Sequence, residues 1–335
     1  MHNPAPGGLR HSWSGRRQAM RRGTVRPERA GRGGAPGGPP AWIAIWSRGL
    51  ERFQTPSRAG VNDPMKRATI AKLSWLLLGF VAGCAETGPV NPSFSVSTQT
   101  AREALDEMRS HPVRLERPVV VLSGYLDPGL GAWWVGRALR KATGDERFLE
   151  LQLLWHATFE SCRTSVIDSV DEAFPSSDPI WTAEVDVVAI SMGGLVARAA
   201  AAPPGENAAT QRRLRIRRLF TISTPHRGAS LAAMPCILPL HRDMGPGSRW
   251  LAQLEEDFGS AEYTVLPYVR LRDWTVGAEN AAPPGMVPWW LSGSIVAPSH
   301  PASATDSRIH ADIARRLRGE EAFARSPAAP LPAGS

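Results

Sequence analysis

The run at residues 185–190, followed directly by Ser191 and two glycines, constrains the fold of this chain more than any other feature. Five of its six residues are apolar, which is typical of a strand buried in a parallel sheet. Residues 195–202 then have the composition of a helix. A strand-to-helix turn this tight accepts only small residues around its centre, and Ala189 and Gly193 meet that requirement. The pattern predicts a strained turn that exposes the Ser191 hydroxyl at the end of the sheet, close to the first helical amides.

Strands and helices alternate along the chain on both sides of this turn. We expect strands over residues 118–123, 148–155, 185–190, 215–223, 268–272 and 289–296. We expect helices over residues 101–109, 133–142, 161–174, 195–202 and 306–318. This alternation predicts an α/β fold with a doubly wound, mostly parallel sheet. All of these elements lie within residues 101–320, which are expected to form one domain, and residues 321–335 are expected to be a disordered tail.

Residues 1–64 differ in composition from the rest of the chain. They are rich in Arg, Gly and Pro, and their 11 arginines against three acidic residues account for the whole formal charge of +8. Such a segment buries too little apolar surface to offset the entropy of ordering, so we expect it to be disordered, or an upstream extension that is not translated. The remaining chain has no net charge, and its composition does not indicate a nucleic-acid-binding protein.

Residues 65–83 have the features of a secretory signal peptide: Met65, basic residues, an apolar run over residues 73–81, and small residues. The run is shorter than the roughly 20 residues of a permanent membrane helix. Its last residues, Val-Ala-Gly before Cys84, are similar to the lipobox of bacterial lipoproteins. This resemblance implies a lipidated Cys84, a tether over residues 84–100 and a place in a bacterial cell envelope, at the outer membrane or the periplasmic face. An ordinary signal peptide with a coincidental cysteine is the alternative.

The turn at Ser191 resembles the nucleophile elbow of α/β-hydrolases of the lipase and esterase type, whose usual sequence is Gly-His-Ser-Met-Gly-Gly. Ala189 and Ile190 stand here in place of the glycine and the histidine. The Thr-Pro-His-Arg-Gly segment at residues 224–228 is similar to one found in triacylglycerol-lipase-like hydrolases. The resemblance implies an α/β-hydrolase fold with a lid insertion at about residues 229–260.

The same resemblance implies a catalytic triad in which the acid and then the histidine follow the serine along the chain. Asp273 comes after a predicted strand and three residues before a valine, as in the Asp-x-x-Val of the family. His300 lies in the loop between the last strand and the last helix. We therefore expect Ser191 to be the nucleophile, His300 the general base and Asp273 the acid that orients the histidine. Asp243, in a segment that also resembles this family, is the alternative acid.

Acyl transfer also requires two backbone amides that bind the oxyanion, one after the nucleophile and one from the loop after the first strand. That loop begins Ser123-Gly-Tyr125, where lipases often have His-Gly-aromatic. The resemblance implies that the amides of Tyr125 and Met192 form the oxyanion hole. A plain turn at the end of a strand is the alternative.

The other histidines and the cysteines are expected to lie outside the catalytic machinery. His226 belongs to the strand directly after the nucleophile, which favours a structural role, and His241 and His310 fall in the lid region and in the last helix. Cys162 and Cys236 would meet an oxidising compartment after export, where such pairs often form disulfides. The sequence contains no Cys/His spacing of the zinc type, and the expected chemistry needs no metal or cofactor.

These patterns together predict a serine hydrolase that cleaves carboxylic esters, with lipid or acyl esters as substrates, through an acyl-enzyme intermediate. A thioesterase, a deacylase of lipid anchors, and a lipoprotein that keeps the fold but only binds a ligand or partner stay open as alternatives. We expect contact with a membrane through Cys84 and none with nucleic acid. Neither the acyl and alcohol specificity nor the oligomeric state can be predicted.

Overall fold

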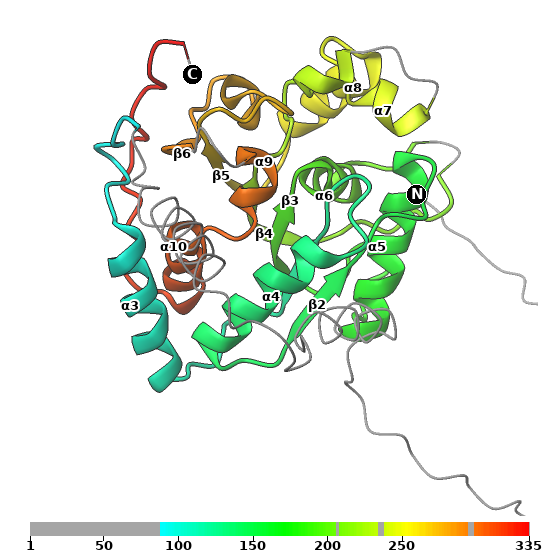
Figure 1. Ribbon diagram of the computed structural model, residues 1–335. Helices are drawn as coiled ribbons and strands as arrows, with labels where there is room; N and C mark the ends of the chain where they lie inside the picture. Colours follow the sequence, from blue (N-terminus) through cyan, green and yellow to red (C-terminus); the bar gives the residue numbers. More distant parts are fainter. Residues whose placement is uncertain (1–87, 206–207, 234–237, 294–297, 335) are drawn as a thin grey trace, which may run out of the picture. The chain divides into compact units, whose positions relative to one another are not determined.

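Figure 1 shows the computed structural model, which describes residues 88–205, 208–233, 238–293 and 298–334. The predicted signal peptide, Cys84 and Cys236 lie outside the described residues. In chain order the elements are α3 (Thr98–Ser110), β1 (Val119–Leu122), α4 (Leu130–Thr143), β2 (Phe148–Leu151), α5 (Phe159–Ala173), β3 (Val185–Ile190), α6 (Met192–Ala201), β4 (Ile216–Ile222), the 3₁₀ helix η1 (Ser230–Ala233), α7 (Pro239–Asp243), α8 (Arg249–Phe258), β5 (Thr264–Arg270), the 3₁₀ helix η2 (Ala278–Ala281), β6 (Trp289–Leu291), α9 (Ser299–Ser303) and α10 (Ser307–Arg318).

The six strands form one parallel sheet in the order β2-β1-β3-β4-β5-β6. The chain runs outward from β1 to β2, returns across β1 to β3, and then adds each later strand on the other side. The predicted doubly wound α/β fold is confirmed. The order reverses between β1 and β3, and in such sheets the crevice at this point, beyond the carboxyl ends of the strands, is where ligands bind. We call this end of the sheet the carboxyl edge and the opposite end the amino edge.

The central strand β3 is buried on both faces, as its apolar sequence predicts. Every residue of β3 is buried, and its side chains alternate between two separate clusters. Val187 packs with residues of α5 and α6, and Val188 with residues of α4 and α10. Burying each such side chain contributes about 1.5–3 kcal/mol. The two helical layers therefore fix β3, and with it the residue that follows β3 (Figure 1).

The segment before α3 corrects the expectation that residues 84–100 are a tether. α3 begins at Thr98, capped by the Ser97 hydroxyl, and Phe94 is buried in the core. The Asn91 amide donates a hydrogen bond of 2.8 Å to the carbonyl oxygen of Trp290 in β6. Residues from Asn91 onward therefore belong to the domain, because a buried ring and a buried amide fix them to it.

The segment after α10 likewise corrects the expectation of a disordered tail over residues 321–335, as far as residue 334. The Trp289 indole N–H donates to the carbonyl oxygen of Arg325 at 2.9 Å, and the Trp290 indole N–H donates to that of Ala329 at 3.0 Å. A buried indole N–H needs an acceptor, and here this segment supplies it. The domain therefore extends to residue 334.

Candidate active site

Ser191 lies in the turn between β3 and α6, with a backbone conformation that residues other than glycine rarely adopt (φ 51°, ψ −125°). Its amide donates to the Ile222 carbonyl oxygen of β4 at 2.9 Å. A Cβ atom at Gly193 would lie 2.6 Å from the Ser123 carbonyl oxygen, so only glycine fits there. The strained turn predicted from the small residues around Ser191 is therefore present, because neighbouring strands hold it from both sides.

The structure brings Ser191, His300 and Asp273 together from three separate parts of the chain. The Ser191 Oγ lies 3.0 Å from His300 Nε2, and His300 Nδ1 lies 2.8 Å from Asp273 Oδ2. Asp273 follows β5, and His300 is the second residue of α9, between β6 and α10. The three side chains form one hydrogen-bonded line at the carboxyl edge of the sheet.

The carboxylate of Asp273 is fully buried and is fixed by its own turn. Its second oxygen, Oδ1, accepts the amides of Thr275 and Val276, each at 3.1 Å. Because the carboxylate can only accept, the N–H of His300 lies on Nδ1, and Nε2 of the neutral ring presents its lone pair to the Ser191 hydroxyl. This tautomer can accept a proton from Ser191.

The alternative residues lie in different surroundings. Asp243, at the end of α7, forms an ion pair of 3.5 Å with Arg242. His310 is buried in α10, where its Nε2 bonds to the Ala304 carbonyl oxygen at 2.9 Å. His241 lies on α7 with its ring centroid 6.3 Å from that of Tyr125. The acid that the structure pairs with His300 is thus Asp273.

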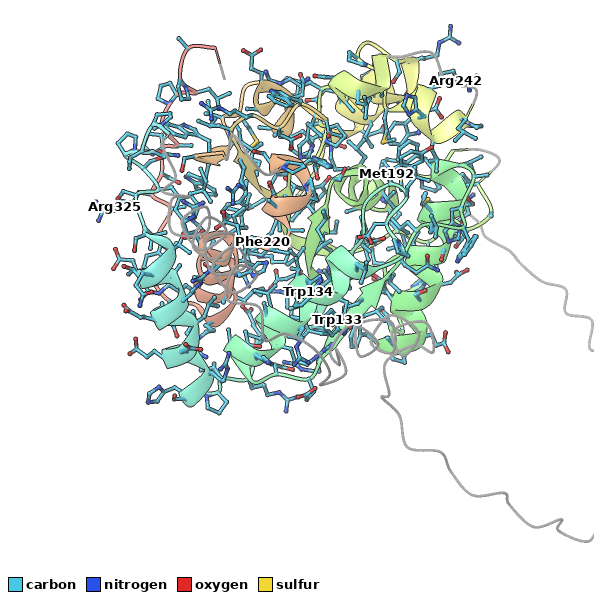
Figure 2. All side chains as sticks on the ribbon, in the orientation of Figure 1. Trp133, Trp134, Met192, Phe220, Arg242 and Arg325 are labelled. Atoms are coloured by element: carbon cyan, nitrogen blue, oxygen red, sulfur yellow. The ribbon has the colours of Figure 1, made fainter. Side chains whose placement is uncertain are left out.

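The loop between β1 and α4 lies against the serine. A Cβ atom at Gly124 would lie 3.2 Å from the Ser191 Cβ. Asp127 holds this loop in place, because its carboxylate accepts the amides of residues 129, 130 and 131 at 2.9, 2.8 and 3.0 Å. Tyr125 follows Gly124, and Met192 is the first residue of α6 (Figure 2). Met192 therefore adjoins Ser191 along the chain, and Tyr125 follows the glycine that lies against Ser191.

Ser123 replaces the histidine that lipases often have at this position, and its buried hydroxyl has a partner in the fold. The Ser123 Oγ accepts the amide of Leu153 at 3.1 Å, which connects the end of β1 to the turn after β2. This hydrogen bond also explains why β2 ends at Leu151 and not at residue 155, as predicted. Ser123 has a structural role.

A buried cation, Arg198 on α6, was not anticipated from the sequence. Its guanidinium is almost fully buried and donates to His226 Nδ1 at 3.1 Å and to Glu255 of α8 at 2.9 Å. His226 Nε2 therefore carries the proton and donates to the Thr221 hydroxyl at 3.1 Å. Burial, followed by the charge of Arg198, holds the pKa of His226 well below its usual value. His226 is therefore neutral and has a structural role. In the sequence, the one sign of the buried cation was an arginine, Arg198, within an otherwise apolar helix.

Exposed apolar side chains gather on the loops and helix starts around the carboxyl edge. The most exposed are Trp274, which directly follows Asp273, at 83% and Trp155, after β2, at 81%. Five others lie on the loop after β1, on the first turns of α4 and between β4 and β5: Leu126, Leu130, Trp134, Leu231 and Leu238 (Trp134 is labelled in Figure 2). We call these seven side chains the apolar rim.

Within the described ranges, no group of three or more His, Cys, Asp or Glu side chains is placed to hold a metal ion. The same residues include no helix long and apolar enough to cross a membrane. Cys162 is a free, buried thiol, and burial raises its pKa to about 12. Because Cys236 lies outside the described residues, the disulfide stays a prediction.

No protein-family model and no curated protein matches the chain. Among solved structures, it is similar to phospholipase PlaB from Legionella pneumophila, with a TM-score of 0.38 and 12% identity over 50% of this chain and 45% of that chain. PlaB in complex with thio-NAD has a TM-score of 0.35 and 14% identity, over 49% of this chain and 40% of that chain. Lipase B from Aspergillus fumigatus has a TM-score of 0.38 and 13% identity, over 74% of each chain. The chain thus spans less than half the length of the PlaB chains that it matches.

Proposed function

We propose that the protein is a serine hydrolase that cleaves carboxylic esters of lipids or other acyl compounds. The observation that carries this proposal is the line from Ser191 Oγ through the His300 ring to Asp273 Oδ2, with distances of 3.0 and 2.8 Å. A serine, a neutral histidine and a buried carboxylate in this order are the groups that convert a hydroxyl into a nucleophile. The strained backbone of Ser191 supports the same role, since such strain gathers at functional sites.

In the proposed reaction, Ser191 Oγ attacks the ester carbonyl carbon while its proton moves to His300 Nε2. The carbonyl oxygen becomes an oxyanion, which the amides of Tyr125 and Met192 stabilise. His300 returns the proton to the leaving alcohol, and the acyl group stays on Ser191. A water molecule then attacks the acyl carbon and gives a proton to His300. His300 passes this proton to Ser191 Oγ as the bond between Oγ and the acyl carbon breaks, which releases the carboxylic acid and restores the Ser191 hydroxyl. Asp273 stabilises the imidazolium in both halves of the reaction.

The apolar rim supports lipid or other long acyl substrates. Its seven side chains are exposed on the loops and helix starts at the carboxyl edge, and gathered exposed apolar groups mark surfaces that bind apolar ligands or interfaces. Nitrophenyl esters of graded chain length measure this preference directly. Rates that rise with acyl length would support a lipid substrate, and rates highest for acetate would indicate a short-chain esterase.

The decisive experiment is labelling with a fluorophosphonate probe, which reacts with an activated serine. We expect labelling of the wild type and none of Ser191→Ala. A folded wild type that resists the probe and all nitrophenyl esters would favour the alternative, a protein that keeps the fold but only binds a ligand. Hydrolysis of acyl thioesters in preference to oxygen esters would favour a thioesterase.

We infer further that Cys84 is lipidated and holds the enzyme at the bacterial cell envelope. The lipobox-like residues support this, and so does the point at which the chain enters the domain. A Cβ atom at Gly88 would lie 2.9 Å from the Ser292 Cβ, just after β6 and so at the carboxyl edge. Four residues span at most about 14 Å, which would keep this edge near the lipid. Mass spectrometry of the native protein tests the inference: a diacylated Cys84 is expected, and tryptic peptides from residues 1–64 would contradict it.

A further inference from the structure

Two consecutive residues after β4, Ser223 and Thr224, use their buried hydroxyls to hold two different parts of the site. The Thr224 hydroxyl donates to the carbonyl oxygen of Ser191 at 2.8 Å. The Ser223 hydroxyl donates to the Ser303 hydroxyl, at the end of α9, at 3.0 Å. Both residues are fully buried, so no water competes for these hydrogen bonds. One short segment thus contacts both the turn that carries Ser191 and the helix that carries His300.

The contact of Thr224 completes a two-point attachment of the Ser191 backbone to the end of β4. The Ser191 amide donates to the Ile222 carbonyl oxygen, and the Ser191 carbonyl accepts the Thr224 hydroxyl. A Cβ atom at Gly194 would lie 2.3 Å from the Thr224 Oγ1, so a glycine at 194 is required for this approach. The second glycine of the turn therefore makes room for Thr224.

The contact of Ser223 continues to the residue before His300. The Ser303 hydroxyl, which accepts from Ser223, donates its own proton to the Ser299 carbonyl oxygen at 2.9 Å. Each hydroxyl in this chain donates once, so the direction of all the hydrogen bonds is determined. Ser223 itself has a φ of 50°, which residues other than glycine rarely adopt. The strain at this residue accompanies a contact that fixes α9 to β4.

We propose that Ser223 and Thr224 are positioning residues that set the distance between Ser191 Oγ and His300 Nε2. Ser191 and His300 are 109 residues apart and share no local segment, so their spacing depends on a common support. The end of β4 supplies that support through two adjacent hydroxyls. Because a displacement of about 1 Å can lower a rate about 100-fold, these bonds act on catalysis and not only on folding. This inference rests on the proposed hydrolase function.

The first arm of the test compares Thr224→Val, which removes the hydroxyl but keeps the branched shape, with Thr224→Ser, which keeps the hydroxyl. We measure kcat and KM for 4-nitrophenyl butyrate and the rate of fluorophosphonate labelling, well below Tm and on the full chain. Thr224→Val is expected to lower kcat and the labelling rate by about 10- to 100-fold while KM changes by less than about twofold. Thr224→Ser is expected to restore most of the rate.

The second arm uses Ser223→Gly and Ser303→Ala, which remove the same hydrogen bond from its two ends. Glycine accepts the φ of residue 223, so Ser223→Gly removes the hydroxyl without adding backbone strain, and Ser303→Ala removes the same hydrogen bond without changing residue 223. The double variant Ser223→Gly/Ser303→Ala is expected to be no slower than either single variant, because both changes remove the same hydrogen bond. In the double variant Thr224→Val/Ser303→Ala, the two losses of rate are expected to multiply. Thr143→Val is the matched control, because the Thr143 hydroxyl is equally buried but bonds to Leu139 and Asp145, at the end of α4. It should lower Tm and leave kcat unchanged.

The proposal is wrong if Thr224→Val and Ser223→Gly lower Tm as Thr143→Val does but react with the probe at the wild-type rate. It is also wrong if Thr224→Ser does not restore activity. Should Thr224→Val fail to fold, the labelling rate of Ser303→Ala is compared with that of the control Thr143→Val. Equal rates would then contradict the proposal. A wild type that is never labelled would overturn the hydrolase itself, and that result is seen without any change at residues 223 or 224.

Discussion

The two edges of the sheet differ in how their residues are held. Among the described residues, every non-glycine residue with a positive φ lies at the carboxyl edge, within four residues after a strand: Leu126, Ser191, Ser223 and Arg272. The apolar rim lies at the same edge. Strained backbone gathers at functional sites, so its position at the carboxyl edge agrees with the active site proposed there.

At the amino edge, several charged residues form ion pairs. Arg117, before β1, donates to Glu184, before β3, and Arg215, before β4, lies 3.6 Å from the same carboxylate. Asp186, near the start of β3, accepts two hydrogen bonds from the Arg218 guanidinium. Under the proposed function, the amino edge stabilises the fold and the carboxyl edge carries the active site. The following predictions test that separation.

The largest effect is expected from the side chains in line with Ser191. Ser191→Ala and His300→Ala should each lower ester turnover by about 10⁶-fold, and Asp273→Asn by about 10⁴-fold because the imidazole loses its orientation. Thermal unfolding should show that all three variants stay folded. A folded Asp243→Asn variant without turnover, next to an active Asp273→Asn variant, would show that the acid is misassigned.

At the amino edge the expected effect is on stability alone. Asp186→Ala should lower the free energy of unfolding by about 3 kcal/mol, because it leaves the Arg218 guanidinium partly buried without its carboxylate. The specific activity of the folded variant should equal that of the wild type. Urea denaturation and active-site titration measure the two quantities separately. A loss of activity per folded molecule would break the division between the two edges.

A pH dependence of stability is expected from two buried histidines, His226 and His310. Burial lowers the pKa of both His226 and His310 below the value of 6.5 in the unfolded chain. Below pH 6.5 the unfolded state therefore binds more protons than the folded state, and stability falls by up to about 1.4 kcal/mol per pH unit for each histidine. Urea unfolding between pH 5 and 8 measures how the free energy of unfolding changes with pH. This change should be smaller for His226→Gln than for the wild type. An unchanged slope would mean that His226 is protonated in the fold.

The smallest effect is a gain of stability from removing strain. Ser191→Gly should unfold with a free energy about 1 kcal/mol higher than that of Ser191→Ala, because glycine accepts a φ of 51° without steric cost. Calorimetry of the two inactive variants measures this difference. Equal stabilities would show that the turn is not strained at Ser191.

The parts of the fold that the sequence predicted are those in which local chemistry and burial agree. β3 has the predicted bounds, because an apolar run that ends at a serine and two glycines permits little else. α4 begins at Leu130, three residues earlier than predicted, because the side chain of Asp127 accepts the amide of Leu130. A hydropathy pattern does not show such a hydrogen bond. Of the site, the resemblance of the motifs pointed to Ser191, Asp273 and His300, and the structure brings these three side chains together.

The parts that could not be predicted depend on contacts between distant residues of unremarkable type. The segments around Asn91 and Ala329 show no apolar periodicity, yet both are fixed to β6 by hydrogen bonds with Trp290. The hydroxyls of Ser223 and Thr224 likewise gain meaning only once α9 and the turn lie beside β4. Such hydrogen bonds leave no mark on hydropathy, so only the folded chain shows them.

The strained backbone of Ser191 also has an evolutionary consequence. In a lineage that had stopped using this hydroxyl, mutations to glycine at residue 191 would relieve the strain and be favoured, or at least tolerated, by selection for folding. This chain retains serine at a position where stability alone favours glycine. Under the proposed hydrolase function, selection for activity would oppose that substitution.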